Sequence, residues 1–173
     1  TTSVTITFGA ANNLVVSTPA AGFVNRTNFA TQPVVTIKDV SGNVVSDATD
    51  NVTVALTGAT LTGTDASVAT KTVAAVNGVA TFSGLGAYGT IGSKTLTFTA
   101  SGLTAASQVF TLTHGAAYQL SVSAPATATN DVAFGTQPVV TIQDQDANTV
   151  TTGAQSIQTV ALTSADTTIG GTT

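Results

Sequence analysis

Apolar and polar residues alternate along much of this chain with a period of two, as in strands that bury one face. Within residues 94–100, Leu96, Phe98 and Ala100 share one face, and threonines occupy the other. Three further segments alternate in the same way: residues 33–39, 52–57 and 110–113. No stretch has the period of a helix, so the pattern predicts an all-β chain.

Turn signals separate these segments. Asn77-Gly78 predicts a tight hairpin within residues 75–80, because both residues readily take the positive φ angles of a type I′ turn. Residues 39–43 read as a second tight turn, and Pro33 fits the first position of a strand. Between Leu14 and Thr113 we expect about seven short strands, with turn signals roughly every 8–12 residues. This pattern is typical of an immunoglobulin-like β-sandwich.

The chain also repeats itself. FATQPVVTIKD at residues 29–39 returns as FGTQPVVTIQD at residues 134–144, an offset of 105. Three further pairs match at an offset of 106: residues 5–11 with 111–117, 14–20 with 120–126, and 54–57 with 160–163. Matches at nearly one offset predict tandem repeats of about 105 residues.

The repeat predicts where domains begin and end. We expect residues 1–9 to be the closing strand of a preceding unit, 10–117 a complete Ig-like β-sandwich, and 118–173 the first half of a second unit. Half a sandwich would expose an apolar face and a strand edge. Three explanations stay open: a window from a longer polyprotein, an assembly whose neighbours share strands, or an unfolded tail.

Four segments resemble a known class of repeats: PVVTIKDVSGNVV, VTVALTG, TVAAVNGVATFSGL and KTLTFTASG. They are similar to the bacterial Ig-like repeats of invasin and intimin relatives, large adhesins and surface-layer proteins. The resemblance implies stalks, spacers or lattice subunits of the cell surface. It implies no catalytic residues.

Composition narrows the function further. Charged residues make up 7% of the chain, against about 25% in ordinary globular proteins. Thr and Ser number 37 and 13, and Cys, Met, Trp and Glu are absent. Four cations and a net charge of −4 argue against nucleic-acid binding. No apolar run approaches the roughly 18 residues of a membrane span, so no membrane insertion is expected. One His and no Glu leave little for acid–base catalysis, so we expect no enzyme.

One segment resembles the opening of a calcium loop. Asp144, Asp146 and Asn148 place oxygen ligands at alternate positions. The motif then departs from the pattern, with Thr149 in place of Gly and Gln155 in place of the closing Glu. The alternative is a turn stabilised by the Asp side chain. No other cofactor is expected.

Modification and ligand candidates are few. Sequons begin at Asn25 and Asn51, no more than chance predicts in a chain this rich in Ser and Thr. Tyr88, in a Gly-rich loop, is the candidate for contacting a glycan. His114 stands where the other copy has Phe8, so packing is favoured over catalysis.

These observations predict a structural, extracellular or cell-surface protein of bacteria. Its partners would be copies of itself, in a filament, surface layer, sheath or adhesin stalk. One alternative is an adhesion module whose end loops bind glycan or matrix. A second is a decoration domain of a phage particle.

Overall fold

The chain is all-β. The computed structural model describes residues 7–62, 67–125, 127, 129 and 132–163. Every strand pair within this part of the chain is antiparallel. The contacts divide the chain into two compact units, Thr1–Thr113 and His114–Thr173, which places residues 114–117 with the second unit.

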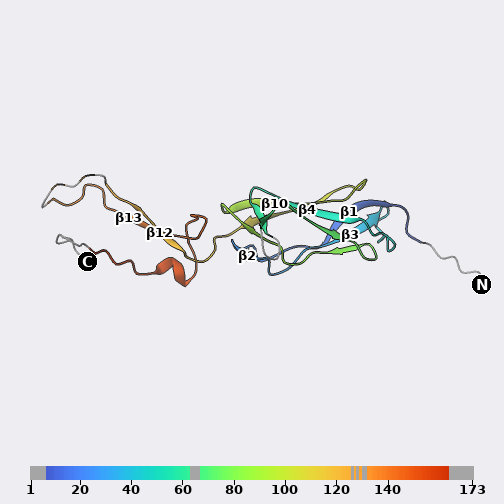
Figure 1. Cartoon of the computed structure of the whole chain (residues 1–173), viewed down its shortest axis with the longest axis horizontal. Coiled ribbons are helices and arrows are strands. Elements are labelled where there is room, and N and C mark those ends of the chain that lie inside the picture. The colour runs from blue at the N-terminus through green and yellow to red at the C-terminus, as the bar shows by residue number, and fades with distance from the viewer. Residues whose placement is uncertain (1–6, 63–66, 126, 128, 130–131, 164–173) are drawn as a thin grey trace, which may run out of the picture. The chain divides into compact units, whose positions relative to one another are not determined.

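Two larger sheets dominate the first unit (Figure 1). A three-stranded sheet has the order β1-β3-β8, from β1 (Ala11–Thr18), β3 (Val34–Asp39) and β8 (Val79–Thr81). A four-stranded sheet has the order β11-β10-β4-β7, from β11 (Ala106–Leu112), β10 (Gly92–Thr99), β4 (Asn51–Thr57) and β7 (Thr70–Ala74). Strand β3 begins immediately after Pro33, which lacks the N–H that a strand interior needs.

A smaller sheet completes the described part of this unit. Its order is β2-β9-β5-β6, from β2 (Thr27–Asn28), β9 (Gly86–Tyr88), β5 (Thr60–Thr62) and β6 (Ser67–Val68). The alternation of the sequence gave no sign of these short pairings. They depend on residues far apart in the chain, since Thr27 pairs with Ala87 and Leu61 with both Ala87 and Val68.

Both larger sheets contribute to one apolar core. Val35 and Ile37 of β3 are fully buried, as are Leu96 and Phe98 of β10. Burying each such side chain contributes about 1.5–3 kcal/mol. The alternation predicted for residues 94–100 is therefore confirmed within β10, where the intervening threonines are half-buried or exposed.

Aromatic rings fill this core in two groups. Phe23 stacks on Phe110, with ring centroids 4.1 Å apart, and Phe29 meets both rings edge-on. Phe82 and Phe98 lie 5.5 Å apart, centroid to centroid. Each group joins residues that are distant in sequence, so these contacts fix the path of the chain through the unit.

The hairpin predicted at Asn77-Gly78 is confirmed. Asn77 has φ 52° and Gly78 has φ 75°, the left-handed values that a type I′ turn requires. The N–H groups of Val76 and Val79 donate to each other's carbonyl oxygens at 2.9 and 3.1 Å. A side chain at Gly78 would also collide with the carbonyl oxygen of Val45, so glycine is needed here for space as well as for conformation.

The second unit contains one strand pair among its described residues, β12 (Gln119–Ser123) with β13 (Val139–Gln143). Leu120 pairs with Ile142 and Val122 with Val140. In the first unit Leu14 pairs with Ile37 and Val16 with Val35, at the same relative positions. A short 3₁₀ helix, η1 (Ala154–Ile157), follows, where the periodicity predicted no helix.

Candidate functional site

The residues singled out as calcium candidates form a tight turn in the second unit. The Asp144 carboxylate is buried and accepts N–H donors on both oxygens. Oδ1 accepts from the backbone N–H of Asp146 and of Asn148, each at 2.9 Å. The Asn148 side-chain amide donates to both oxygens, at 3.1 and 3.0 Å. Oδ2 also accepts the backbone N–H of Gly115 at 2.9 Å, across 29 residues of sequence.

The first unit has the same arrangement around Asp39. Oδ1 accepts the backbone N–H groups of Ser41 at 3.0 Å and Asn43 at 2.8 Å. Oδ2 accepts the Asn43 side-chain amide at 3.0 Å and the backbone N–H of Gly9 at 2.8 Å. We call residues 39–43 and 144–148 the carboxylate turns. Each turn combines a local bend with one long-range bond to a glycine.

This geometry favours the turn interpretation over cation binding. A calcium ion needs oxygen atoms directed at it, whereas N–H donors already surround these carboxylates. Among the described residues, no group of three or more His, Cys, Asp or Glu side chains could hold a metal ion. Calcium at Asp144, Asp146 and Asn148 remains a prediction without a supporting contact.

The hydrogen bonds stabilise the charged form of the carboxylate. The Gly9 N–H makes the largest contribution, followed by the Asn43 side-chain amide, and together with the other donors they outweigh the opposing effect of burial. They lower the pKa of Asp39 from 3.8 to about 2. Asp39 is therefore ionised at any physiological pH.

The His114 ring makes hydrogen bonds within its own unit. Its Nε2 lies 2.9 Å from the Thr152 hydroxyl and accepts the backbone N–H of Thr152 at 3.3 Å, while Nδ1 lies 3.0 Å from the carbonyl oxygen of Gly115. With its proton on Nδ1, the ring donates to the Gly115 carbonyl oxygen and accepts from Thr152 at Nε2. The equivalent Phe8 packs against the core of the first unit. Both positions hold the chain in place.

The ring of Tyr88, the candidate residue for contacting a glycan, makes a cation–π contact with an arginine. The Arg26 guanidinium lies over the Tyr88 ring, 4.7 Å from its centroid. Tyr88 is half-buried and Arg26 is exposed, with φ 61°. A tyrosine ring flanked by a guanidinium can stack on a sugar and donate hydrogen bonds to its hydroxyls.

The two sequons lie in different environments. Asn25 is 1% exposed, and its side-chain oxygen accepts the N–H of Gly89 at 3.0 Å. Asn51 is exposed at the first position of β4. A glycosyltransferase needs access to the amide nitrogen, so of the two only Asn51 has an accessible side chain in the folded protein.

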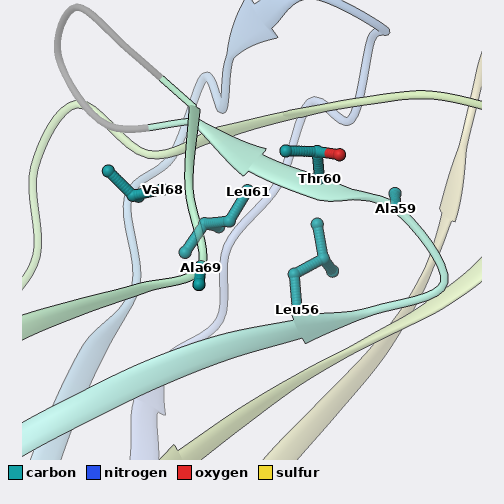
Figure 2. Close-up of a pocket in the computed structure, with 6 residues that line it drawn as sticks. All are labelled: Leu56, Ala59, Thr60, Leu61, Val68 and Ala69. Carbon is teal, nitrogen blue, oxygen red and sulfur yellow. The ribbon is translucent and has the colours of Figure 1, made fainter.

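A shallow hollow of about 390 Å³ lies at the end of β4 (Figure 2). Its lining comes from β4, β5, β6 and the residues that adjoin them: Leu56, Ala59, Thr60, Leu61, Val68 and Ala69. Thr60 supplies the one polar side chain of this lining. None of these described lining residues is an acid or a base.

Most outward positions of the four-stranded sheet are small hydroxyl residues, and the others are Asn51, Ala55, Ala74 and Val109. Thr53 pairs with Thr72 on one side and Thr99 on the other, and the Thr53 and Thr72 hydroxyls lie 2.7 Å apart. We call this surface the hydroxyl face; its members are Thr53, Thr70, Thr72, Thr95, Thr97, Thr99, Ser107 and Thr111. No charged side chain occupies an outward position of these four strands.

Comparisons with known proteins identify no family for this chain. No family model and no curated protein matches it. Among solved structures, it is similar to part of a β-glycosidase from Bacteroides vulgatus, with a TM-score of 0.43 and 12% identity. The match covers 61% of this chain and 14% of the glycosidase. A similarity this distant carries no inference about activity. Within the described residues, no helix is long and apolar enough to cross a membrane.

Proposed function

We propose that this chain is part of a structural protein on the outside of a bacterial cell. In this proposal, tandem immunoglobulin-like β-sandwiches of about 105 residues build a filament, surface layer, sheath or adhesin stalk by self-association. The chain contributes no catalysis and needs no cofactor. Copies of itself are its partners.

The hydroxyl face is the observation that carries this proposal. A sheet surface of Thr and Ser side chains approaches an identical surface without repulsion between like charges. Each hydroxyl both donates and accepts a hydrogen bond, so such a face is complementary to itself. Near-neutral surfaces also favour association over solubility.

The repeated features of the two units support a modular design. Each unit carries the same strand register in its first hairpin and the same carboxylate turn at the end of that hairpin. A protein that extends by adding units needs each unit to reproduce its own connections. The resemblance to bacterial Ig-like repeats points to the same use.

Electron microscopy of the native material, with variants of the full chain, tests the proposal. Regular filaments, tubes or sheets are expected. Thr97→Lys should abolish them, because Thr97 lies on a central strand of the hydroxyl face, opposite Ser107. Val40→Lys is the matched control, since Val40 is 85% exposed in a turn outside that face. Isolated particles from the native material, or equal assembly by both variants, would contradict the proposal.

An adhesion module is the second candidate, and the Arg26–Tyr88 pair is the observation that favours it. In that case the chain would bind a glycan saturably, and Tyr88→Ala would abolish the binding. A glycan array probed with the wild-type chain and with Tyr88→Phe and Tyr88→Ala separates the two functions. Tyr88→Phe keeps the stacking ring and should retain most of the affinity.

A further inference from the structure

Strand β13 of the second unit has a partner on one side only. Among the described residues it pairs with β12, and no strand lies along its other edge. Its counterpart in the first unit, β3, is a central strand with β1 on one side and β8 on the other. The side chains of β13 are partly exposed, with Val139 at 60% and Val140 at 38%. An open strand edge with apolar side chains readily pairs with a strand of another chain.

In the first unit, residues 78–85 cover the equivalent edge. They run antiparallel to residues 29–37, and β8 pairs with β3 in the middle of this stretch. At one end of the pairing, the Ile37 N–H donates to the carbonyl oxygen of Gly78 at 2.8 Å. Residues 78–85 therefore show what the edge of β3 binds.

A glutamine side chain holds the other end of the covering segment. Gln32 Oε1 accepts the N–H of Leu85 at 2.9 Å, and Gln32 Nε2 donates to the carbonyl oxygen of Leu85 at 3.0 Å. The same Nε2 group donates to the carbonyl oxygen of Phe29 at 2.8 Å, which fixes the side chain in place. The Phe29 N–H adds a further bond of 2.8 Å to the Leu85 carbonyl oxygen. Leu85 is thus recognised through its backbone.

Residues 134–142 of the second unit repeat the residues that bind this segment. Their sequence, FGTQPVVTI, differs at one position from FATQPVVTI of residues 29–37. The Gln137 Nε2 group donates to the carbonyl oxygen of Phe134 at 2.9 Å, the same local bond that its counterpart makes in the first unit. Phe134 is nevertheless 43% exposed, whereas Phe29 is 3% exposed. The described second unit therefore presents the binding groups without the strand that covers them in the first unit.

We propose that residues 134–142, the acceptor segment, bind an extended strand of another polypeptide that has the residue pattern of residues 78–85, GVATFSGL. The bound strand would lie beside β13 as β8 lies beside β3, and would extend the pair to a three-stranded sheet. A two-stranded hairpin is at best marginally stable in water, and an added strand supplies main-chain hydrogen bonds and apolar contacts. Neither segment carries a charge, so recognition depends on backbone pairing and shape.

A folded second copy of this chain is a poor source of that strand. Its own residues 78–85 are occupied, since Ala80, Phe82 and Leu85 are each at most 1% exposed. Releasing them would expose the core of the first unit to water. The partner is therefore a segment that is free and extended before it binds. This inference concerns the second unit alone and does not depend on the proposed function.

Nuclear magnetic resonance of the ¹⁵N-labelled full chain, titrated with a synthetic peptide of residues 78–85, tests the proposal. Resonances of the acceptor segment should shift until they saturate. Hydrogen exchange of the Ile142 amide should slow about tenfold or more, the effect of one added hydrogen bond, because its counterpart Ile37 donates to Gly78. Resonances of residues 29–37 are the internal control, since their edge is already covered and should not respond.

A pair of variants of the chain tests the glutamine. Gln137→Ala should weaken binding of the peptide about tenfold, because it removes two hydrogen bonds to the peptide's leucine. Gln145→Ala is the matched control, since Gln145 is exposed in the turn that follows β13. Equal affinity of the two variants for the peptide would contradict the assigned role of Gln137.

Two N-methylated peptides test the strand pairing. The Phe82 N–H donates to the carbonyl oxygen of Pro33 at 3.1 Å, so a methyl group on this nitrogen should prevent binding at the equivalent Pro138. A methyl group on the nitrogen of Thr81 should leave binding intact, because successive N–H groups of a strand point to opposite edges. The proposal is overturned if excess peptide leaves the acceptor segment unchanged, if both methylated peptides bind equally, or if self-association of the chain already protects the Ile142 amide without peptide.

Discussion

The pair formed by β1 and β3 and the pair formed by β12 and β13 match equivalent apolar side chains in the same register. The exposed fractions of these side chains nevertheless differ widely between the two pairs. Leu14 is 4% exposed and its counterpart Leu120 is 53% exposed, while Val35 is 0% and Val140 is 38% exposed. In the first unit, residues of β4 and β10 share the core with this hairpin. The described second unit has no such sheet. The hairpin pattern therefore determines pairing, and burial comes from strands elsewhere in the chain.

A charged side chain placed at equivalent positions of the two strand pairs should give the largest difference in the loss of unfolding free energy. Val35→Asp would put an unpaired carboxylate among fully buried residues, and we expect a loss of about 3–5 kcal/mol in the unfolding free energy of the first unit. Val140→Asp should cost less than about 1 kcal/mol, because water reaches its side chain. Urea unfolding, followed through resonances of each unit separately, measures both. Equal costs would show that the second hairpin is buried in solution.

Exchanging glycine and alanine at equivalent positions of the two carboxylate turns should change stability by a smaller amount. Gly42 has φ 84° and the equivalent Ala147 has φ 60°, so alanine occupies a left-handed position that glycine takes freely. Gly42→Ala should destabilise the first unit by about 1 kcal/mol, and Ala147→Gly should stabilise the second by a similar amount. No heavy atom approaches a side chain built at Gly42 within 4 Å, so the effect is purely conformational. Thermal unfolding of the two variants measures it, and effects of the same sign would contradict the explanation.

Acid titration tests the Asp39 carboxylate turn through the pH dependence of stability. The pKa of Asp39 is lowered from 3.8 to about 2, so its ionised form stabilises the folded unit. The sign follows from linkage: the contribution is complete above about pH 4 and is lost as the pH falls towards 2. Asp39→Asn should remove this pH dependence. Carbon-detected titration of the side-chain carboxyl measures the pKa directly, and a value near 3.8 would contradict the hydrogen bonds described.

Local pattern was sufficient for strands β3, β4 and β10, and not for the short strands of the smaller sheet or for the long-range bonds of the carboxylate turns. The alternation around Leu96 and Phe98 and the Asn77-Gly78 pair depend on neighbours in sequence, so they could be predicted. Asp39 and Asp144 were recognisable only as turn residues, since their glycine partners lie 30 and 29 residues away. The one available signal was that a glycine and an Asp-x-x-x-Asn segment both recur in the repeat. Likewise, nothing in the Asn25 sequon indicates that its side chain is buried against Gly89.

The Asn77-Gly78 turn bears on the chemical durability of the chain. Asn-Gly pairs deamidate when the glycine nitrogen attacks the asparagine side chain and closes a five-membered ring. Here the Gly78 N–H donates to the carbonyl oxygen of Ala48 at 3.0 Å, and Gly78 is buried. The nitrogen would have to break that bond and move before it could react. Asn-Gly is the residue pair that deamidates fastest in an unfolded peptide. In this fold the pair is held in a geometry that slows the reaction.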